Sequence, residues 1–377
     1  MRVLLLSAYA AASHQHWQRS LQAMFPDWQW QVLTLPPRHF SWRIRGNPLY
    51  WALSERALLE GEYDLLVATS MVDLATLRGL VPGLARLPSL LYFHENQFDY
   101  PQRSGQHSLV EAQMVSLYSA LAADSLAFNS AYNRDTFLSG VDALLRKLPD
   151  RVPVGVTDIL AAKASVLPVP IDMDGSGASD FRWPGVGGCY PQRPLRLLWS
   201  GRFEHDKGGG TLLHTLSELE GLGLNYELAM TGQQFRSSPA VFSRIETEFS
   251  HRLVQFGYLP DIADYRALLR QADVVLSTAR HEFQGLAVLE AVASGCLPAV
   301  PDRLAYPEIY PAQFRYSSHT NDSDANIEAV DAAALVCRLG RTIEQGDAVA
   351  PDVSLYGSGK LQPRYADLLQ ALAAAAG

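Results

Sequence analysis

The chain has 377 residues, of which 48% are hydrophobic and 19% charged, with a formal net charge of −8. This length suffices for two domains with separate cores. The chain contains no uncharged apolar run of about 18 residues, so we expect no membrane span. The acidic balance argues against a protein that binds nucleic acid through its overall charge. The neutral first half (residues 1–165, with 14 Lys and Arg against 14 Asp and Glu) could still present a local basic surface.

The N-terminal segment RVLLLSAY (residues 2–9) has the length of a buried strand, and Trp and His residues follow too closely for a signal-peptide cleavage region. We therefore expect an intact N-terminus and a cytoplasmic protein. Three widely spaced cysteines, an odd number, argue against both a disulfide framework and a zinc site.

Short, continuous apolar runs alternate with helical patterns along the whole chain, as parallel strands buried on both faces do. In the first half we expect strands in RVLLLSAY, QVLTL, DLLVATS, SLLYFHE, SLAFNS and ASVLPVP. In the second half we expect them in LRLLWSG, NYELAMTG, LVQFGYLP, DVVLSTA and CLPAV. The alternation predicts two doubly wound, Rossmann-like α/β domains facing a central cleft.

Composition sets the expected boundaries. Residues 172–194 are dense in Gly, Pro and Ser, which indicates a linker or surface loop. We therefore predict an N-terminal domain over 1–170, a linker over 171–194, and a C-terminal domain over 195–355. Residues 356–377 are predicted to form a tail helix that packs back on the N-terminal domain.

The segment RHEFQGLAVLE (residues 280–290) places two glutamates eight positions apart. Glu282 follows a predicted strand, and Glu290 lies about two helical turns further on. The free N–H groups around Gly285 and Leu286 at the helix N-terminus suit a diphosphate or a sugar hydroxyl. Taken alone, Glu282 could instead cap the helix and Glu290 could be solvated.

The segment SGRFEHDKGGG (residues 200–210) follows another predicted strand. Arg202 and Lys207 could neutralise a leaving diphosphate, although a solvated turn is an equal alternative. Its three glycines do not form a P-loop, because the required Lys-Ser/Thr after the last glycine is missing.

A third polar group, YFHENQ (residues 92–97), ends a first-half strand. Its His94, Asn96 and Gln97 are unusual at the end of a buried strand unless something polar docks there. No H-E-x-x-H metal pattern is present, and a lone histidine is more often structural than catalytic.

Together these segments resemble the retaining glycosyltransferases of the GT-B fold, which share a Glu-x7-Glu motif and an Arg and Lys pair on the donor diphosphate. A narrower resemblance is to the tRNA-queuosine α-mannosyltransferase family. It extends over most of the chain through the blocks LPPRHFSWRIRGNPLYW, LYFHENQFDYP, FNSAYNRDTF, EHDKG, GYLP, STARHEFQGLAVLEAV and YPEIYPAQFRYS. YFHENQ is far more specific than Glu-x7-Glu.

The resemblance implies transfer of mannose from GDP-mannose to the cyclopentene ring of queuosine in a tRNA anticodon. The N-terminal domain would bind the acceptor and the C-terminal domain the nucleotide sugar. No metal or other cofactor is expected, because Arg202 and Lys207 would stabilise the departing diphosphate. The other expected contacts to the donor are from His94, His205, Glu282, Gly285, Leu286 and Glu290.

For retention, the resemblance implies front-face attack, in which the leaving phosphate takes the acceptor proton. A two-carboxylate mechanism is the competing geometry. It is disfavoured because Glu282 and Glu290 both belong to the donor domain.

For the acceptor, the resemblance points to Ser13, His14, Asn96 and Gln97. The family pattern leads us to expect Gly-Gly-Ser-His after the first strand, where this chain has Ala-Ala-Ser-His (residues 11–14). Alanine restricts positive φ and adds a methyl group, so this loop could be remodelled.

The segment PPRHFSWRIRGNPLYW (residues 36–51) interleaves arginines with aromatic residues. Cations for phosphates beside rings for stacking suit a single-stranded anticodon loop, and the cations are Arg38, Arg43 and Arg45. An amphipathic loop whose aromatics pack into the core is equally compatible.

Other functions remain open at this stage. A related transferase could glycosylate a lipid, polysaccharide or small molecule, but no strong basic amphipathic helix predicts stable membrane association. A sugar-nucleotide epimerase or hydrolase would not need a large acceptor surface. A non-catalytic tRNA-binding protein would have no reason to keep Glu282, Arg202 and Lys207.

Overall fold

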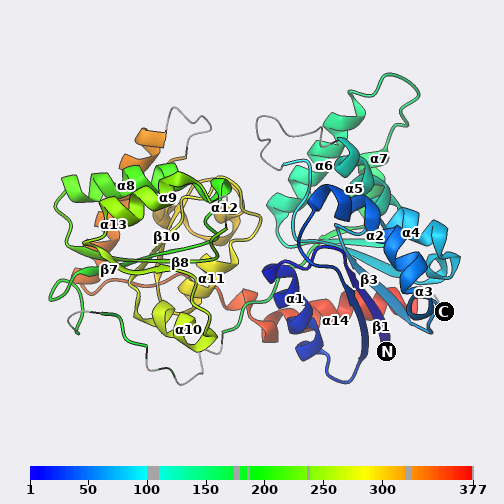
Figure 1. The fold of residues 1–377 in the computed structure, drawn as a ribbon, viewed down its shortest axis with the longest axis horizontal. Coiled ribbons are helices and arrows are strands. Elements are labelled where there is room, and N and C mark those ends of the chain that lie inside the picture. The colour runs from blue at the N-terminus through cyan, green and yellow to red at the C-terminus, as the bar shows by residue number, and fades with distance from the viewer. Residues whose placement is uncertain are drawn as a thin grey trace. The chain divides into compact units, whose positions relative to one another are not determined.

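A computed structural model describes residues 1–99, 110–173, 179, 181–184, 187–235, 238–318 and 325–375. The chain divides into two compact units (Figure 1). The first unit comprises residues 1–170 and 358–377, and the second comprises residues 171–357.

The first unit is built on a six-stranded parallel sheet in the order β2-β1-β3-β4-β5-β6. Its strands are β1 (Arg2–Ser7), β2 (Gln29–Thr34), β3 (Leu65–Thr69), β4 (Ser89–Phe93), β5 (Ser125–Phe128) and β6 (Ala164–Val166). Its helices are α1 (Ala12–Met24), α2 (Phe40–Ser54), α3 (Arg56–Leu59), α4 (Leu74–Leu80), α5 (Val110–Ala122), α6 (Ala131–Leu145), α7 (Val156–Ala162), α14 (Ser358–Ala374) and the 3₁₀ turn η1 (Pro82–Arg86).

The second unit holds another six-stranded parallel sheet, in the order β12-β11-β10-β7-β8-β9. Its strands are β7 (Leu195–Ser200), β8 (Tyr226–Thr231), β9 (Leu253–Gly257), β10 (Val274–Leu276), β11 (Leu297–Pro301) and β12 (Arg315–Tyr316). Its helices are α8 (Gly209–Gly221), α9 (Ala240–Glu248), α10 (Ile262–Gln271), α11 (Leu286–Ala293), α12 (Tyr306–Ile309), α13 (Ala325–Glu344) and the 3₁₀ turns η2 (His205–Lys207), η3 (Ala312–Phe314) and η5 (Ser354–Tyr356).

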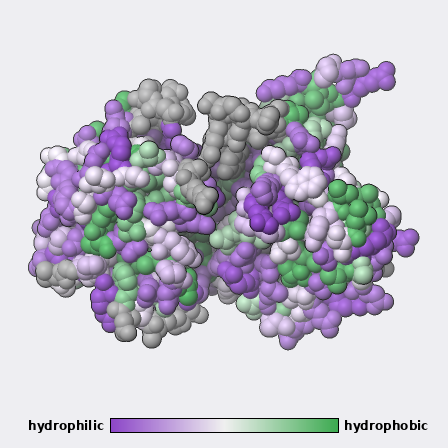
Figure 2. Space-filling model, viewed as in Figure 1, coloured by the Kyte–Doolittle hydropathy of each residue, from purple (hydrophilic) through white to green (hydrophobic). Residues whose placement is uncertain are grey.

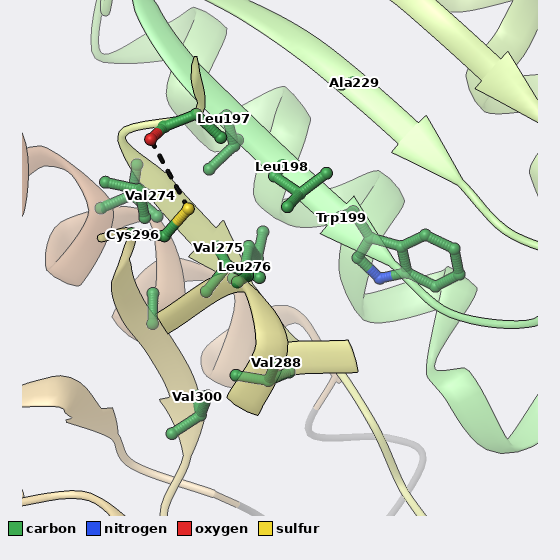
Figure 3. Close-up of a cluster of buried hydrophobic side chains, with 14 of the residues drawn as sticks. Leu197, Leu198, Trp199, Ala229, Val274, Val275, Leu276, Val288, Cys296 and Val300 are labelled. Carbon is green, nitrogen blue, oxygen red and sulfur yellow. Dashed lines mark hydrogen bonds between the residues drawn. The ribbon is translucent and has the colours of Figure 1, made fainter. Parts of the chain in front are cut away.

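Every strand expected from an apolar run is present, so the α/β class is confirmed. Strand β12 was not expected, because two residues carry no periodic signal. In the first sheet, the central strands β3 and β4 are buried along their whole length because helices cover both faces (Figure 1). In the second unit, Leu197 and Leu198 of β7 pack with Val275 of β10, Val288 of α11 and Val300 of β11 (Figure 3).

Each sheet has one point where the strand order reverses. In the first sheet it lies between β1 and β3, and in the second between β7 and β10. The loops that leave two such strands diverge to opposite faces, which opens a crevice at the carboxyl edge of the sheet where ligands bind in doubly wound folds.

The predicted linker lies within the second unit rather than between the units. Ile171 and Trp183 are buried in the core of that unit, and the Trp183 indole donates to Glu227 at 2.6 Å. Arg193 forms a bidentate pair with Asp273, at 2.6 and 2.8 Å. Gly and Pro content marks a loop correctly, but it does not reveal that side chains anchor the loop.

The C-terminal helix α14 belongs to the first unit, where it contacts α1, β3 and β4. Its Leu361, Tyr365 and Leu369 are fully buried. The polypeptide therefore returns to the first unit after the second sheet is complete.

Candidate functional site

In the second unit, two loops from the strand-order reversal meet through Lys207. One loop follows β7 and carries Lys207, and the other follows β10 and carries Glu282. The Lys207 ammonium lies 3.0 Å from Glu282 Oε2 and 3.1 Å from Asp206 Oδ2, and it donates to the His281 carbonyl at 3.1 Å. The predicted cation and one predicted carboxylate are thus direct partners.

Backbone contacts hold these two loops in register. Gly208 has φ +68°, and a Cβ there would lie 1.9 Å from the Thr278 carbonyl oxygen. The Thr278 hydroxyl donates to the Lys207 carbonyl at 2.9 Å. Only a glycine at position 208 permits this approach, because it has no Cβ and adopts positive φ without strain.

The charges of the cluster stabilise one another. Burial opposes ionisation of Lys207, Asp206 and Glu282, but the opposite charges outweigh it: the pKa of Lys207 lies above its usual value and those of both carboxyls lie below theirs. Glu282 is therefore an ionised, acceptor-only group. It is suited to receiving hydrogen bonds from sugar hydroxyls and unsuited to acting as a general acid.

Gly285, Leu286 and Glu290 lie at the start of α11 and in its second turn. Gly285 is the N-cap with φ +74°, and a Cβ there would lie 3.0 Å from the Tyr306 ring. The Tyr265 hydroxyl of α10 donates to Glu290 Oε2 at 3.1 Å. Burial, reinforced by Glu290, raises the pKa of Tyr265 well above its usual value.

Sequence reasoning did not single out Tyr265. Its position within the amphipathic pattern DIADYRALLRQA gave no sign that its hydroxyl reaches Glu290, 25 residues away.

The remaining predicted donor residues are more exposed. Arg202 is about half exposed and lies 3.1 Å from Glu204. A cavity of about 320 Å³ lies at the N-terminus of α8, lined in part by His205, Gly208–Gly210 and Arg280 but not by Glu282 or Glu290. The N–H groups of the first helical turn and the Arg280 side chain favour an anion in this cavity, and Glu204, which also lines it, opposes one.

In the first unit, His94 lies in a cluster of aromatic rings at the carboxyl end of β4. It stacks on His14 with 4.0 Å between ring centroids, and the edges of Trp17 and Tyr92 meet it at 5.0 and 4.7 Å. His94 is 7% exposed, and its Nε2 has no hydrogen-bond partner among the described residues. A buried imidazole nitrogen without a partner is suited to a hydrogen bond with a ligand.

The C-terminal helix α14 contributes Tyr365 to this cluster. Trp17 Nε1 donates to the Tyr365 hydroxyl at 2.8 Å, and that hydroxyl donates to the Pro168 carbonyl at 3.0 Å. The Tyr92 hydroxyl donates to the Leu167 carbonyl at 2.8 Å. Trp17 and Tyr365 were missed from the sequence, because 348 residues separate them.

We expect His94 to make stability pH-dependent. Burial, with a smaller contribution from His14 and His16, holds the pKa of His94 well below its ordinary value of 6.5. Below pH 6.5 the unfolded chain therefore binds a proton that the folded chain does not. Stability should be complete above pH 6.5 and fall as pH decreases, by at most about 1.4 kcal/mol per pH unit. Urea denaturation from pH 7.5 to 5 measures this slope.

The substitution His94→Gln should flatten that slope, because glutamine does not titrate. His214→Gln, at an exposed histidine of the second unit, is the matched control and should leave the slope unchanged. Equal slopes in wild type and His94→Gln would contradict the expectation.

Two predicted acceptor residues are buried just after β4. Asn96 is 1% exposed: its amide donates to Asn133 and Thr136, and its oxygen accepts from the backbone N–H groups of Phe98 and Asp99. These contacts use its hydrogen-bonding capacity. Gln97 is 3% exposed, with its amide 4.0 Å from the Met71 sulfur. Asn96 thus closes the loop that follows β4.

The Ala-Ala-Ser-His segment begins helix α1 without strain. Ala11 is its N-cap, with φ −64° and ψ 165°, values that any residue adopts. Ser13 is half-buried in the first turn, and His14 is buried against His94. Alanine in place of glycine is therefore compatible with this backbone.

The basic and aromatic segment (residues 36–51) is largely helical and forms most of α2. Some of its side chains are exposed, as an RNA-binding surface requires, and others pack into the core. Trp51 is buried, whereas Trp42 is 55% exposed. Arg38 is exposed, and Arg43 is half-buried. Arg45 instead lies 2.7 Å from the buried Asp73 and 3.3 Å from Glu111, so opposite charges already neutralise it.

Neither a metal cluster nor a membrane span is found in the described ranges. They contain no group of three or more His, Cys, Asp or Glu residues arranged to hold a metal ion. No helix in the same ranges combines the length and apolar character needed to cross a bilayer.

Comparisons with solved structures confirm the predicted GT-B fold. The chain is similar to a UDP-forming α,α-trehalose-phosphate synthase from Burkholderia xenovorans, with a TM-score of 0.67, 12% identity and 99% coverage of each chain. It is also similar to Anabaena HepE in complex with UDP and glucose, with a TM-score of 0.63, 13% identity and coverage of 98% and 100%.

Sequence comparisons identify the family. Residues 2–171 match the model of the tRNA-queuosine alpha-mannosyltransferase N-terminal domain, and residues 190–334 match glycosyl transferases group 1. A GDP-mannose:cellobiosyl-diphosphopolyprenol alpha-mannosyltransferase from Xanthomonas oryzae is 27% identical over 34% of this chain and 33% of its own. The tRNA-queuosine alpha-mannosyltransferase of Drosophila melanogaster is 30% identical over 97% of this chain and 96% of its own. The chain therefore belongs to the tRNA-queuosine alpha-mannosyltransferase family.

Proposed function

We propose that this protein transfers mannose from GDP-mannose to queuosine in the anticodon of tRNA, in the cytoplasm. The observation that carries the proposal is the whole-chain similarity to the Drosophila tRNA-queuosine alpha-mannosyltransferase. The similarity to the mannosyltransferase extends over both units, whereas the match to glycosyl transferases group 1 lies in the second unit alone.

The geometry of the second unit supports a nucleotide-sugar donor. Lys207 and Arg202 supply positive charge beside the reversal point of the second sheet, where a diphosphate would be bound. Glu282, ionised and held by Lys207, would accept hydrogen bonds from the sugar. Glu290, oriented by Tyr265, would accept them from the ribose.

In the reaction, the bond between the mannose anomeric carbon and the diphosphate oxygen breaks with both electrons leaving on GDP. A hydroxyl oxygen of the cyclopentene ring forms the new bond, and the departing diphosphate takes its proton. An α-linked product from an α-linked donor requires net retention, which front-face attack achieves. The ion pair with Lys207 favours a binding role for Glu282 over a covalent one. This mechanism requires no metal.

In the first unit, which we assign to the acceptor, His94 is the candidate ligand contact. His94 would donate or accept one hydrogen bond through its unpartnered Nε2, with His14 fixing the ring. Because burial lowers its pKa, His94 would act as a neutral imidazole.

The test is to incubate the purified protein with each nucleotide sugar and with tRNA from cells grown with or without queuosine. Nucleoside mass analysis is expected to show a hexose-sized gain only when GDP-mannose and queuosine are both present. Equal transfer to queuosine-free tRNA, or transfer from no donor, would refute the proposal.

A further inference from the structure

The first turn of α2 lies beside the β1–α1 loop, which directly precedes the helix that carries His14. The Leu35 N–H donates to the Ser7 carbonyl and the Ala10 N–H to the Leu35 carbonyl, both at 2.9 Å, so the β2–α2 connection runs along the β1–α1 loop. The Phe40 ring meets Tyr9 edge-on, with 6.3 Å between centroids. Whatever α2 binds near its N-terminus is thus close to the carboxyl edge of the first sheet.

Trp42, in that first turn, lies against the helix surface. A Cβ at Gly46, one turn further on, would lie 2.5, 2.6 and 2.7 Å from three Trp42 ring atoms. The ring therefore covers position 46, and any side chain larger than that of glycine there would have to displace the ring. Because Trp42 remains 55% exposed, the helix supports one side of the ring and solvent meets the other. A half-exposed indole that lies flat on a helix is well suited to stacking on a nucleic-acid base.

Positive charge near the ring is confined to the same end of the helix. Arg38 precedes α2 and is exposed, and Arg43 directly follows Trp42. Further along the same helix face the exposed side chains are Leu49, Tyr50 and Leu53. The charges flanking Leu53 are Glu55 and the paired Arg56 and Glu60. Figure 2 shows apolar surface where Figure 1 places α2 and α4.

We propose that Trp42 is a base-stacking platform of the tRNA-binding surface, with Arg38 and Arg43 contacting the adjacent phosphates. This inference rests on the proposed function, since tRNA is the partner. RNA is favoured over a membrane because Arg38 and Arg43 lie close to Trp42 in the sequence, whereas Leu53, at the aliphatic end of the helix, precedes acidic Glu55 by two residues.

The experiment measures binding of purified tRNA, with and without queuosine, by filter retention at several salt concentrations. Trp42→Ala is expected to weaken tRNA binding at least about 5-fold, and Trp42→Phe to retain most of the affinity, because an aromatic face suffices for stacking. Gly46→Ala should weaken binding by displacing the ring. The KM for GDP-mannose should stay unchanged in all three variants.

Leu53→Ser is the matched control, because it removes another exposed apolar side chain from the same helix face. It should leave tRNA affinity unchanged. Arg43→Gln should reduce the slope of log affinity against log salt concentration by about 0.7 to 0.9, as loss of one phosphate contact does. Thermal melting of each variant verifies folding.

Three results would overturn the inference. The first is unchanged tRNA affinity in Trp42→Ala, and the second is an equal loss in Leu53→Ser. The third is wild-type binding to phosphatidylserine vesicles that Trp42→Ala abolishes while tRNA binding persists. Failure of the proposed function looks different: tRNA binding would still depend on Trp42, but no hexose would be transferred to queuosine.

Discussion

Replacing Lys207 with methionine is expected to lower kcat about 10²- to 10³-fold, the usual loss when one preorganised group that stabilises transition-state charge is removed. Lys207 is the cation that joins the two loops at the reversal of the second sheet, with a 3.0 Å contact to Glu282. Charge grows on the diphosphate as its bond to mannose breaks, so the loss should fall on kcat. Steady-state kinetics with saturating tRNA measure the effect, and tRNA affinity should remain within about 2-fold if Lys207 contacts only the donor.

A stability effect must be separated from the catalytic one. Lys207→Met leaves Asp206 and Glu282 without their cation, which is destabilising for largely buried carboxylates. The double variant Lys207→Met/Asp206→Asn removes one of these negative charges. It should recover part of the lost melting temperature and none of the lost kcat. Recovery of kcat together with stability would show that Lys207 acts on the fold alone.

Replacing Gly208 with alanine is expected to destabilise the second unit by about 3 kcal/mol or more, from positive-φ strain together with overpacking. The added Cβ would lie 1.9 Å from the Thr278 carbonyl oxygen, and backbone cannot move aside as a flexible side chain can. The two loops must separate, so kcat should fall as well. Urea denaturation and kinetics on the same preparation measure both effects.

Gly210→Ala provides a closely matched control. This glycine lies two residues further on, in the first turn of α8, and a Cβ there meets nothing within 4 Å. Alanine is a better helix former than glycine, so stability should stay equal or rise by up to about 1 kcal/mol. Similar losses in both variants would indicate that the loop tolerates no side chain anywhere, against the specific contact with Thr278.

The sequence predicted the strands well because a buried parallel strand leaves a local signature: a short apolar run with no polar alternation. It also placed Lys207 and Glu282 at strand ends, where doubly wound folds bind ligands. It did not predict the direct pairing of those two residues, because 75 positions separate them. Residue type and spacing report which groups lie at an edge, not which of them touch.

The same limit applies to Asn96 and to the predicted linker. Asn96 looked like a ligand-binding amide, but its partners come from α6, 37 and 40 residues later. Glycine and proline content marked 171–194 as a loop, but burial of Trp183 in the second core depends on a fold that composition does not describe. The ion pair between Arg45 and Asp73 likewise has no signal in the sequence.

The sequence by itself determined the two α/β units, the family, and the residue types that a donor site requires, since each depends on local pattern or on a quoted motif. Only the tertiary structure decided that Lys207 is held by two carboxylates, that Tyr365 closes the ring cluster behind His94, and that Trp42 lies on Gly46. The physical reason is that burial, pKa and ring orientation are set by neighbours in space. Such neighbours are brought together by the two folded sheets and by the packing of α14 in the first unit.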